Sequence, residues 1–425
     1  MVFPVVGGDG KPTGYEISNS LRFDEDNDSL TRTMGTPTST RIFTYSGWHK
    51  RGVPTSNQHS FLSWGGSTYA TDLRYESSTD ALFLYFDDNT GWYAKTKTLF
   101  RDVSAWYHIV IAVDTTQATE SNRLKLYVNG TQVGPALDGT DWTQHEIFGQ
   151  NYDFPELASG QTMAIGKRNS SNSHFFDGYM SEVNFIDGQA LDSSYFGETD
   201  DNGVWIPKEY DGTYGNNGFF LEFKQSGDSA NSSGKGADTS GNDNHFTANN
   251  MSGVIPVVDT PTNNFATLNP LNIRLGIGIT HSEGNLQVQR TTTGGGTAGA
   301  FSTIAGLKRG KWYAEFKPTV VNNSATMRFG IEDTDFNAAD GLCNVAASAY
   351  ASNGNKGRNA SDSSYGDSYD DNDIIGVAVD LDNGAIYFSK NGTWQNSSDP
   401  ESGSSKTGAA FTDILTILPD GGYMF

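Results

Sequence analysis

The chain has 425 residues and a formal net charge of −22 at pH 7, from 50 acidic and 28 basic side chains. This length suffices for two domains that each bury a hydrophobic core. A charge this negative disfavours nucleic acid as a partner, because phosphate groups are repelled. No sequence segment approaches the roughly 20 consecutive apolar residues of a membrane-spanning helix, so membrane insertion is not expected.

The sequence predicts an all-β protein. Short apolar runs alternate with segments rich in Gly, Ser, Thr, Asn and Asp, and no long window repeats apolar residues at helical spacing. Cys343 is the single cysteine, so an intrachain disulfide cannot form, and a small buried thiol is its expected role.

Residues 1–197 are expected to form a first β-sandwich. The run Trp106–Val113 is almost continuously apolar, which is typical of a central strand covered on both faces. Further strands are expected over Leu21–Phe23, Phe43–Trp48, Phe61–Trp64, Leu82–Phe86 and Phe176–Phe185.

Residues 198–264 are expected to form an irregular connector. This segment has one strand-like run, Phe219–Phe223, and a long polar stretch, Asp228–Asn244, which predicts a loop.

Residues 265–425 are expected to form a second sandwich, with strands over Trp312–Phe316, Met327–Ile331 and Ile374–Val379. The final residues offer only Ile414–Leu418 and Tyr423–Phe425 as strand candidates. We therefore expect that the natural protein continues past Phe425 or that another chain supplies a missing strand.

The two sandwiches share a repeated hairpin. In the first copy a strand ending in Ala112-Val113-Asp114 is followed by Leu124–Val128 and then by Asn129-Gly130. In the second copy Ala378-Val379-Asp380 is followed by Ala385–Lys390 and then by Asn391-Gly392. Asn-Gly tolerates the positive φ angles of a tight turn and is the strongest short-range hairpin signal. The repeat predicts two related sandwiches.

These patterns carry a family resemblance. The first unit resembles laminin-G-like, concanavalin A-type domains through Phe43–Trp48, Trp106–His108, Leu126–Gly130 and Phe176–Val183. The second resembles a SPRY domain through Gly310–Phe316, Gly330-Ile331, Asn372–Val377 and Asp380–Gly384. The resemblance implies two concanavalin A-like antiparallel jelly-roll sandwiches, a fold that mostly binds ligands rather than transforming them.

The arrangement as a whole is similar to structural proteins of tailed bacteriophages. The similar segments are Phe3–Gly8, Gly14–Phe23, Asp200–Lys208 and Asp238–Asn244. This resemblance implies a virion fibre or other appendage that contacts other virion proteins and assembles as a homo-oligomer, with a trimer as the expected state. The N-terminus lacks the basic start and apolar run of a secretory signal, so we expect synthesis in the host cytoplasm and exposure on the particle.

The sequence gives little support for catalysis. Glycosidases of the concanavalin A type resemble one another in a Glu-x-Asp-x-Glu strand, because two carboxylates about 5 Å apart must flank the sugar bond. The nearest run here is Glu332-Asp333-Thr334-Asp335, whose order is wrong. The histidines show no paired spacing for zinc, and His108 is expected to be a hydrogen-bonded structural residue within a strand.

No cofactor is required by these patterns, but Ca²⁺ is a possible ligand. Clustered carboxylates offer the hard oxygens that Ca²⁺ prefers, and laminin-G-like domains bind calcium on such loops. None of the clusters has the regular spacing of a known calcium loop, so solvated acidic loops are the favoured interpretation of them. The candidate ligands are Asp24, Asp26, Asp28, Asp87, Asp88, Asp370, Asp371 and Asp373.

Aromatic residues in expected loops are the candidate glycan-binding groups, because exposed rings stack against sugar faces. Packing in the sandwich core is the competing interpretation for each of them. Trp142, inside the polar run Asp138–Gln144, is expected to be the most exposed. The candidates are Trp64, Tyr69, Trp92, Tyr93, Trp142 and Trp394.

Three functions therefore remain open from the sequence. The leading hypothesis is a non-enzymatic phage appendage that binds host-surface glycan. The second is a structural scaffold or adaptor that packs on neighbouring chains, and the third, least favoured, is a glycoside hydrolase.

Overall fold

The computed structural model describes residues 14–54, 57–66, 70–86, 91–135, 138–273, 278–291, 298–321, 326–334, 347–358 and 361–425. These residues form β-strands and short 3₁₀ turns, with no α-helix among them. None of the described helical segments is long and apolar enough to cross a membrane. The chain divides into two compact units. The first runs to Phe265 and includes His281–Val288, and the second comprises Ala266–Thr280 and Gln289–Phe425.

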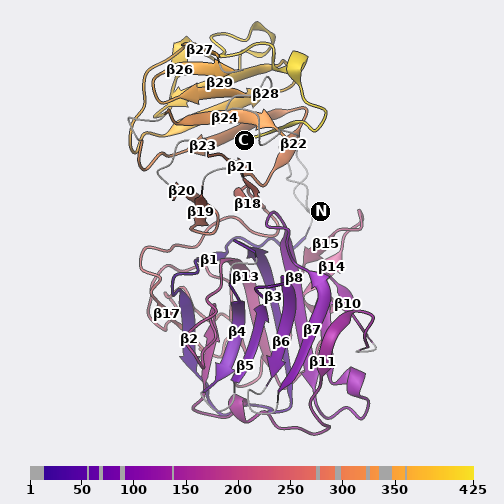
Figure 1. The fold of residues 1–425 in the computed structure, drawn as a ribbon. Coiled ribbons are helices and arrows are strands. Elements are labelled where there is room, and N and C mark those ends of the chain that lie inside the picture. The colour runs from indigo at the N-terminus through magenta and orange to yellow at the C-terminus, as the bar shows by residue number, and fades with distance from the viewer. Residues whose placement is uncertain are drawn as a thin grey trace. The chain divides into compact units, whose positions relative to one another are not determined.

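The first unit contains a seven-stranded antiparallel sheet, drawn around β3 and β8 in Figure 1. Its strand β8 is long and almost fully buried, as predicted for a central strand, and its neighbours β3 and β13 are long and buried as well. Its strands are β1 (Leu21–Phe23), β13 (Gly178–Asp187), β3 (Ile42–Arg51), β8 (Trp106–Asp114), β9 (Leu124–Val128), β10 (Thr131–Val133) and β16 (Phe219–Leu221), which pairs with β13.

An eight-stranded antiparallel sheet forms the other layer of this sandwich. Its order is β11 (Trp142–Glu146), β7 (Trp92–Leu99), β6 (Ala81–Phe86), β5 (Ala70–Tyr75), β4 (His59–Gly65), β12 (Thr162–Ile165), β2 (Ser29–Thr33) and β17 (Thr247–Asn249). The inner faces of the two sheets enclose one aromatic-rich core. In it, the rings of Phe43 from β3 and Trp64 from β4 meet edge to face at 5.3 Å.

The expected connector over 198–264 is instead an integral part of the first sandwich. Phe219 and Phe246 lie in its core at 0% exposure, and β16 and β17 extend its two sheets. On the outer face of the seven-stranded sheet, Val110 and Ile186 pack against Leu191, Phe196, Tyr210 and Tyr214. This face is therefore covered by the chain itself. The same region contains η1 (Glu120–Asn122), η2 (Pro155–Leu157), η3 (Ser193–Tyr195), β14 (Gly197–Thr199) and β15 (Trp205–Pro207).

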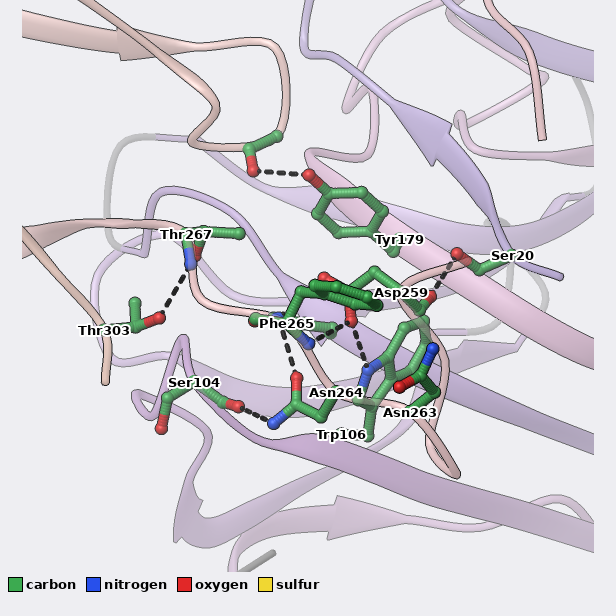
Figure 2. A network of polar contacts seen from close by, with 12 residues as sticks. Ser20, Ser104, Trp106, Tyr179, Asp259, Asn263, Asn264, Phe265, Thr267 and Thr303 are labelled. Atoms are coloured by element: carbon green, nitrogen blue, oxygen red, sulfur yellow. Dashed lines mark hydrogen bonds and ion pairs between the residues drawn. The ribbon is translucent and has the colours of Figure 1, made fainter. Parts of the chain in front are cut away.

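A buried lysine fastens the end of this covering segment. Lys50 of β3 is 1% exposed, and its ammonium donates to Asp259 at 2.8 Å, to Asn264 at 2.8 Å and to the Phe265 carbonyl at 2.7 Å. Burial lowers the pKa of Lys50, while Asp259 opposes that shift. Figure 2 shows Asp259 also accepting from the Trp106 indole at 3.2 Å. All three ammonium donors are thus satisfied by one short segment.

Strand β13 is interrupted by a bulge on the same covered face. The pairing with β3 shifts between Ser181 and Asn184, and Glu182 has a φ of 50°. The Glu182 carboxylate, 9% exposed, accepts a hydrogen bond from Tyr15 at 3.1 Å. Burial, together with repulsion from Glu222, raises the pKa of Glu182 to about 8 against the opposing hydrogen bond from Tyr15.

The second unit is a separate, smaller sandwich built from a six-stranded and a four-stranded sheet. The six-stranded sheet has the order β22 (Ala305–Leu307), β31 (Tyr423–Met424), β24 (Arg328–Asp333), β25 (Ser348–Ala351), β26 (Asn355–Arg358) and β27 (Ser361–Ser364). The four-stranded sheet has the order β23 (Lys311–Phe316), β28 (Ile375–Asp380), β29 (Ala385–Lys390) and β30 (Thr393–Trp394). Buried aliphatic and aromatic side chains such as Val377, Phe388 and Tyr350 form its core.

The end of the chain differs in part from the expectation. The run Ile414–Leu418 is not a strand, because Ile414–Ile417 form the 3₁₀ turn η6. Tyr423–Met424 do form a strand, β31, which pairs with both β22 and β24. The remaining elements are β18 (Leu268–Ile273), β19 (Ile279–Ser282), β20 (Gln287–Arg290), β21 (Ala300–Ser302), η4 (Gln395–Ser397) and η5 (Gly403–Ser405).

Both predicted hairpins are confirmed. Asn129 and Gly130 have φ angles of 46° and 83°, and Asn391 and Gly392 have 50° and 78°. The Asn129 side chain also accepts a hydrogen bond from the His108 N–H at 2.8 Å, near the start of β8. The Asn391 side chain likewise accepts one from the Ile374 N–H at 2.8 Å, directly before β28. The asparagine therefore serves both as a left-handed turn residue and as a link to the adjacent strand.

The repeated turn gives a matched pair of substitutions. Gly392→Ala should lower the free energy of unfolding of the second unit by about 1 kcal/mol, because φ is 78° but a Cβ would meet no atom within 4 Å. Gly130→Ala should cost the first unit more, because its Cβ would lie 2.4 Å from Trp205. Denaturant unfolding of both variants tests this, and equal losses would contradict it.

The buried Glu182 gives a pH-dependent prediction. Between about pH 4.5 and 8 the folded state holds a proton that the unfolded state has released, so this group lowers stability as pH rises through that window. Glu182→Gln should therefore leave stability nearly unchanged at pH 5 and raise it by at least about 1 kcal/mol at pH 9. Denaturant unfolding at both pH values measures the difference, and a gain independent of pH would refute it.

Candidate functional site

The outer face of the eight-stranded sheet carries a row of aromatic side chains. Side chains alternate between the faces of a strand. Because Leu82, Leu84 and Ala94 point into the core, Phe83, Tyr85 and Tyr93 lie on the opposite face. Tyr85 pairs with Tyr93 across β6 and β7, and all three rings are partly exposed.

The rings form a ladder. The Phe83 and Tyr85 ring centroids are 5.9 Å apart, those of Phe83 and Tyr93 are 5.8 Å apart, and both pairs are nearly parallel. The guanidinium of Arg74, on neighbouring β5, lies over Phe83 at 4.5 Å and near Tyr85 at 5.9 Å. Lys95 pairs with Phe83 from the other side. We call Arg74, Phe83, Tyr85, Tyr93 and Lys95 the aromatic face.

A carboxylate holds Arg74 in place. Asp72 accepts from Arg74 at 2.8 Å and from His174 at 3.2 Å, and Glu76 lies 3.6 Å from the same guanidinium. Burial alone would raise the pKa of Asp72, but His174 and Arg74 hold this pKa below its usual range. Arg74 is 8% exposed, so its guanidinium packs against the rings and has little contact with solvent.

A loop covers one part of this outer face. The Ser63 hydroxyl on β4 donates to the Lys167 carbonyl at 2.7 Å and accepts from the Asn169 N–H at 2.9 Å, while the Ser60 N–H donates to the His174 carbonyl at 2.8 Å. Ser60 and Ser63 are buried as a result. The loop therefore covers β4, and the aromatic rings over β6 and β7 remain partly open.

A pocket of about 310 Å³ adjoins the aromatic face. It shares Lys95 with that face and also contains Lys97 and Thr143, whose hydroxyl donates to the Lys95 carbonyl at 3.1 Å. Lys95 and Lys97 form no ion pair with any carboxylate in the described part of the chain. The complete lining is Thr79, Ala81, Lys95, Thr96, Lys97, Leu99 and Thr143.

The structure separates the predicted aromatic residues. Tyr93 lies on the aromatic face, whereas Trp394 belongs to the second unit. Trp92 turns to the core side, where its ring meets Tyr152 edge to face at 4.2 Å. Tyr69 lies outside the described residues.

The predicted exposure of Trp64 and Trp142 is wrong. Trp64 is 0% exposed within β4 and Trp142 is 1% exposed at the start of β11, so neither ring can stack on a ligand. The polar run around Trp142 leads into the edge strand β11. Trp142 is the one apolar residue of this run, and it points into the core. Its indole donates to the Gly134 carbonyl at 3.1 Å.

Phe83, Tyr85 and Arg74 were missed by the sequence interpretation. The run Leu82–Phe86 is apolar throughout, so it does not show which side chains point outward. The neighbouring strand contains that signal, because Tyr93, Lys95 and Lys97 alternate with Ala94 and Thr96. Aligning the two strands would have placed Phe83 and Tyr85 outside.

The acidic clusters do not form a metal site among the described residues, where no group of three or more His, Cys, Asp or Glu is placed to hold a metal ion. Asp373 is occupied by Lys390 at 3.2 Å and by the Asn391 amide at 2.7 Å. Asp370 and Asp371 are exposed, and Asp371 accepts from the Val321 N–H. The use of Ca²⁺ at any of these positions stays a prediction.

The N-terminal acidic cluster is also occupied by local contacts. The Asp24 carboxylate accepts from the Asp26 N–H at 3.1 Å, and Asp28 is 3% exposed. Burial, followed by repulsion from Asp24, raises the pKa of Asp28 to about 7. Asp87 and Asp88 lie outside the described residues.

Of the other candidate chemical groups, His108 is confirmed as structural. Its ring bonds to the Ser46 hydroxyl at 2.9 Å and to the Trp205 indole at 3.0 Å. Cys343 and Asp335 lie outside the described residues, and Glu332 and Asp333 end strand β24.

Two parts of the chain match known protein families. Residues 24–194 match the Laminin_G_3 model, described as the concanavalin A-like lectin/glucanases superfamily, and residues 311–410 match the SPRY domain. The chain contains a concanavalin A-like domain and a SPRY domain. The match to the first domain covers every residue of the aromatic face. A search of the curated proteins finds no match.

Several solved structures are similar at low sequence identity. A native heptameric SAP-like pentraxin from Limulus polyphemus is 16% identical, with a TM-score of 0.30, and the match covers 42% of this chain and 80% of that one. The CBM40 of a Ruminococcus gnavus IT-sialidase, bound to α2,3-sialyllactose, is 12% identical over 42% and 96%, with a TM-score of 0.28. The enzymatically active domain of tailspike protein 2 from bacteriophage CBA120 is 12% identical over 42% and 26%, with a TM-score of 0.29. This chain thus spans about a quarter of the tailspike chain.

The burial of Trp142 can be tested directly. Trp142→Ala should lower the free energy of unfolding of the concanavalin A-like domain by about 3–5 kcal/mol, because it leaves a large core cavity and removes the bond to Gly134. Thr143→Ala, at the exposed neighbour, should cost less than about 1 kcal/mol and serves as the control. Equal, small losses in denaturant unfolding would show that Trp142 is exposed.

Proposed function

We propose that the concanavalin A-like domain binds carbohydrate on its aromatic face. The observation that carries this proposal is the stacked, partly exposed ladder of Phe83, Tyr85 and Tyr93 on the outer face of β6 and β7. Ligand sites combine apolar and aromatic surface with a few placed polar groups. A sugar presents the matching chemistry, with C–H faces for the rings and hydroxyls for the polar groups.

The polar groups around the ladder fit this role. Lys95 forms no ion pair among the described residues, so its ammonium group can donate to sugar hydroxyls or to the carboxylate of an acidic sugar. The Lys97 ammonium lies nearby and donates to the Gly139 carbonyl. The ladder rings are held by each other and by Arg74, so little side-chain freedom is lost on binding. The pocket beside Lys95 can accept a second sugar unit of a chain.

The proposed activity is binding without hydrolysis. Retaining hydrolysis needs two carboxylates about 5 Å apart, one of them protonated through a raised pKa. The buried carboxylate under the aromatic face, Asp72, has a lowered pKa and is engaged by Arg74 and His174. Its chemistry is that of a positioning group for Arg74.

We extend the proposal to the biological setting. The sequence similarity to tailed-phage structural proteins supports a virion appendage, made in the host cytoplasm and displayed on the particle as a homo-oligomer, with a trimer as the expected state. Host-surface glycan would be its ligand and other virion proteins its neighbours. Several linked copies would make weak individual sites effective through effective concentration.

The experiment is binding of the full chain to a glycan array and to intact candidate host cells. Tyr85→Ala and Tyr93→Ala should each weaken binding about tenfold or more, because truncating a central aromatic contact typically costs upwards of about 1 kcal/mol. Tyr195→Ala removes a ring that is 47% exposed elsewhere in the same unit and should leave binding unchanged.

Melting curves would confirm that the three variants are folded. If the wild-type chain bound neither array nor cells, the structural scaffold would replace this proposal. If it bound and Tyr85→Ala and Tyr93→Ala had no effect, the aromatic face would be the wrong site. Glycan cleavage would overturn the non-enzymatic assignment.

A further inference from the structure

The SPRY domain carries an aromatic corner on the outer face of its four-stranded sheet. The core side of this sheet is marked by Val377 and Phe388, so the residues that alternate with them point outward. One outward cross-strand row runs Glu315–Gly376–Ser389–Trp394, in register over all four strands. Tyr313 lies two residues before Glu315 on the same outward side of β23.

The Tyr313 ring packs over Gly376 of this row. A Cβ built on Gly376 would be 2.6 Å from the Tyr313 hydroxyl oxygen, 3.2 Å from the Tyr313 Cε2 and 2.3 Å from the Ser389 hydroxyl oxygen. The edge of the Tyr313 ring and the Ser389 hydroxyl therefore share the space that a side chain would fill. The hydroxyl donates to Glu315 at 2.7 Å, which fixes the ring position. Tyr313 is nevertheless 54% exposed, so a large part of this fixed ring faces solvent.

Trp394 supplies the second wall. Its ring centroid is 6.3 Å from that of Tyr313, and the planes meet at 64°. Trp394 is partly buried and lies on the two-residue strand that follows the Asn391-Gly392 turn. The exposed Tyr313 ring and the inclined Trp394 ring beside it form a preformed corner.

The polar groups at the corner select the ligand. Glu315 is exposed beside Tyr313, and its carboxylate accepts hydrogen bonds and repels anions. Lys311, on the other side of Tyr313, has its charge directed to Asp380 at 3.6 Å. A neutral sugar offers C–H groups to the ring and hydroxyl donors to Glu315. A proline ring offers the apolar surface but no donor.

We propose that Tyr313, Trp394 and Glu315 form a second carbohydrate-binding site, specific for a neutral sugar unit and independent of the aromatic face. The chain then carries two sites of different chemistry. The site on the concanavalin A-like domain has the ammonium groups of Lys95 and Lys97 beside it and suits acidic or hydroxyl-rich sugars, whereas the corner has a carboxylate and excludes acidic ones.

The test uses the full chain carrying Tyr85→Ala and Tyr93→Ala, so that the aromatic face is removed. The probes are neutral tetrasaccharides of gluco, manno and galacto configuration, with binding measured by calorimetry and by saturation-transfer NMR. At least one probe should bind this background variant. Adding Tyr313→Ala or Trp394→Ala should weaken that binding about tenfold or more.

Further variants separate a direct contact from a structural effect. Tyr313→Phe keeps the ring and removes the bond to Glu315, so it should weaken binding only a few-fold. Gly376→Ala displaces the ring and should act like Tyr313→Ala. Val320→Ala removes apolar surface that is 68% exposed elsewhere in the same unit and should have no effect.

The proposal is overturned if no neutral probe binds the background variant, or if Tyr313→Ala binds as tightly as its parent. Capture of a proline-rich peptide with no sugar binding would assign the corner to a peptide instead. These outcomes are independent of the aromatic face, because the background variant lacks it.

Discussion

The concanavalin A-like domain depends on the burial of one ammonium group. Lys50 extends from the central strand β3 into an environment with almost no water, and an ion buried there without partners would cost several kcal/mol. Asp259, Asn264 and the Phe265 carbonyl satisfy all three of its donors. These partners belong to one short segment, so folding of the sheet and docking of that segment are coupled. The Trp106 indole and the Ser20 hydroxyl add further bonds to Asp259.

This coupling decides where a ligand can bind. Once the chain after β13 is fastened, its aromatic side chains cover the outer face of the seven-stranded sheet, and that face is removed from solvent. On the other sheet, the loop that engages Ser60 and Ser63 covers β4. The rings of Phe83, Tyr85 and Tyr93 on β6 and β7 stay partly exposed. The aromatic face is thus a surface of the sandwich that a ligand can reach.

Local signals in the sequence predicted the fold better than the site. Asn129-Gly130 and Asn391-Gly392 required positive φ angles, and the structure has them at both turns. The role of residues 198–264 was not predictable from composition, because Phe246 stands alone among polar residues and the run Phe219–Phe223 is short, and only tertiary packing shows that Phe219 and Phe246 belong to the core. Trp142 was misassigned for the same reason. Of the aromatic face, only Tyr93 was named beforehand, since an apolar strand such as Leu82–Phe86 does not reveal which rings point outward.

The two proposed binding sites keep their aromatic rings ordered in different ways. An exposed ring binds weakly if it must first be ordered, because the lost rotamer freedom opposes association. On the aromatic face, Arg74 and neighbouring rings hold Phe83 and Tyr85 in place. On the four-stranded sheet of the SPRY domain, Gly376 has no side chain, so the Tyr313 ring can pack over it. Glu315 accepts a hydrogen bond from the Tyr313 hydroxyl and thereby fixes the position of the ring. Each ring is therefore ordered by the fold before a ligand arrives. The group that orders it also sets the local charge, which is why the two sites should prefer sugars of different charge.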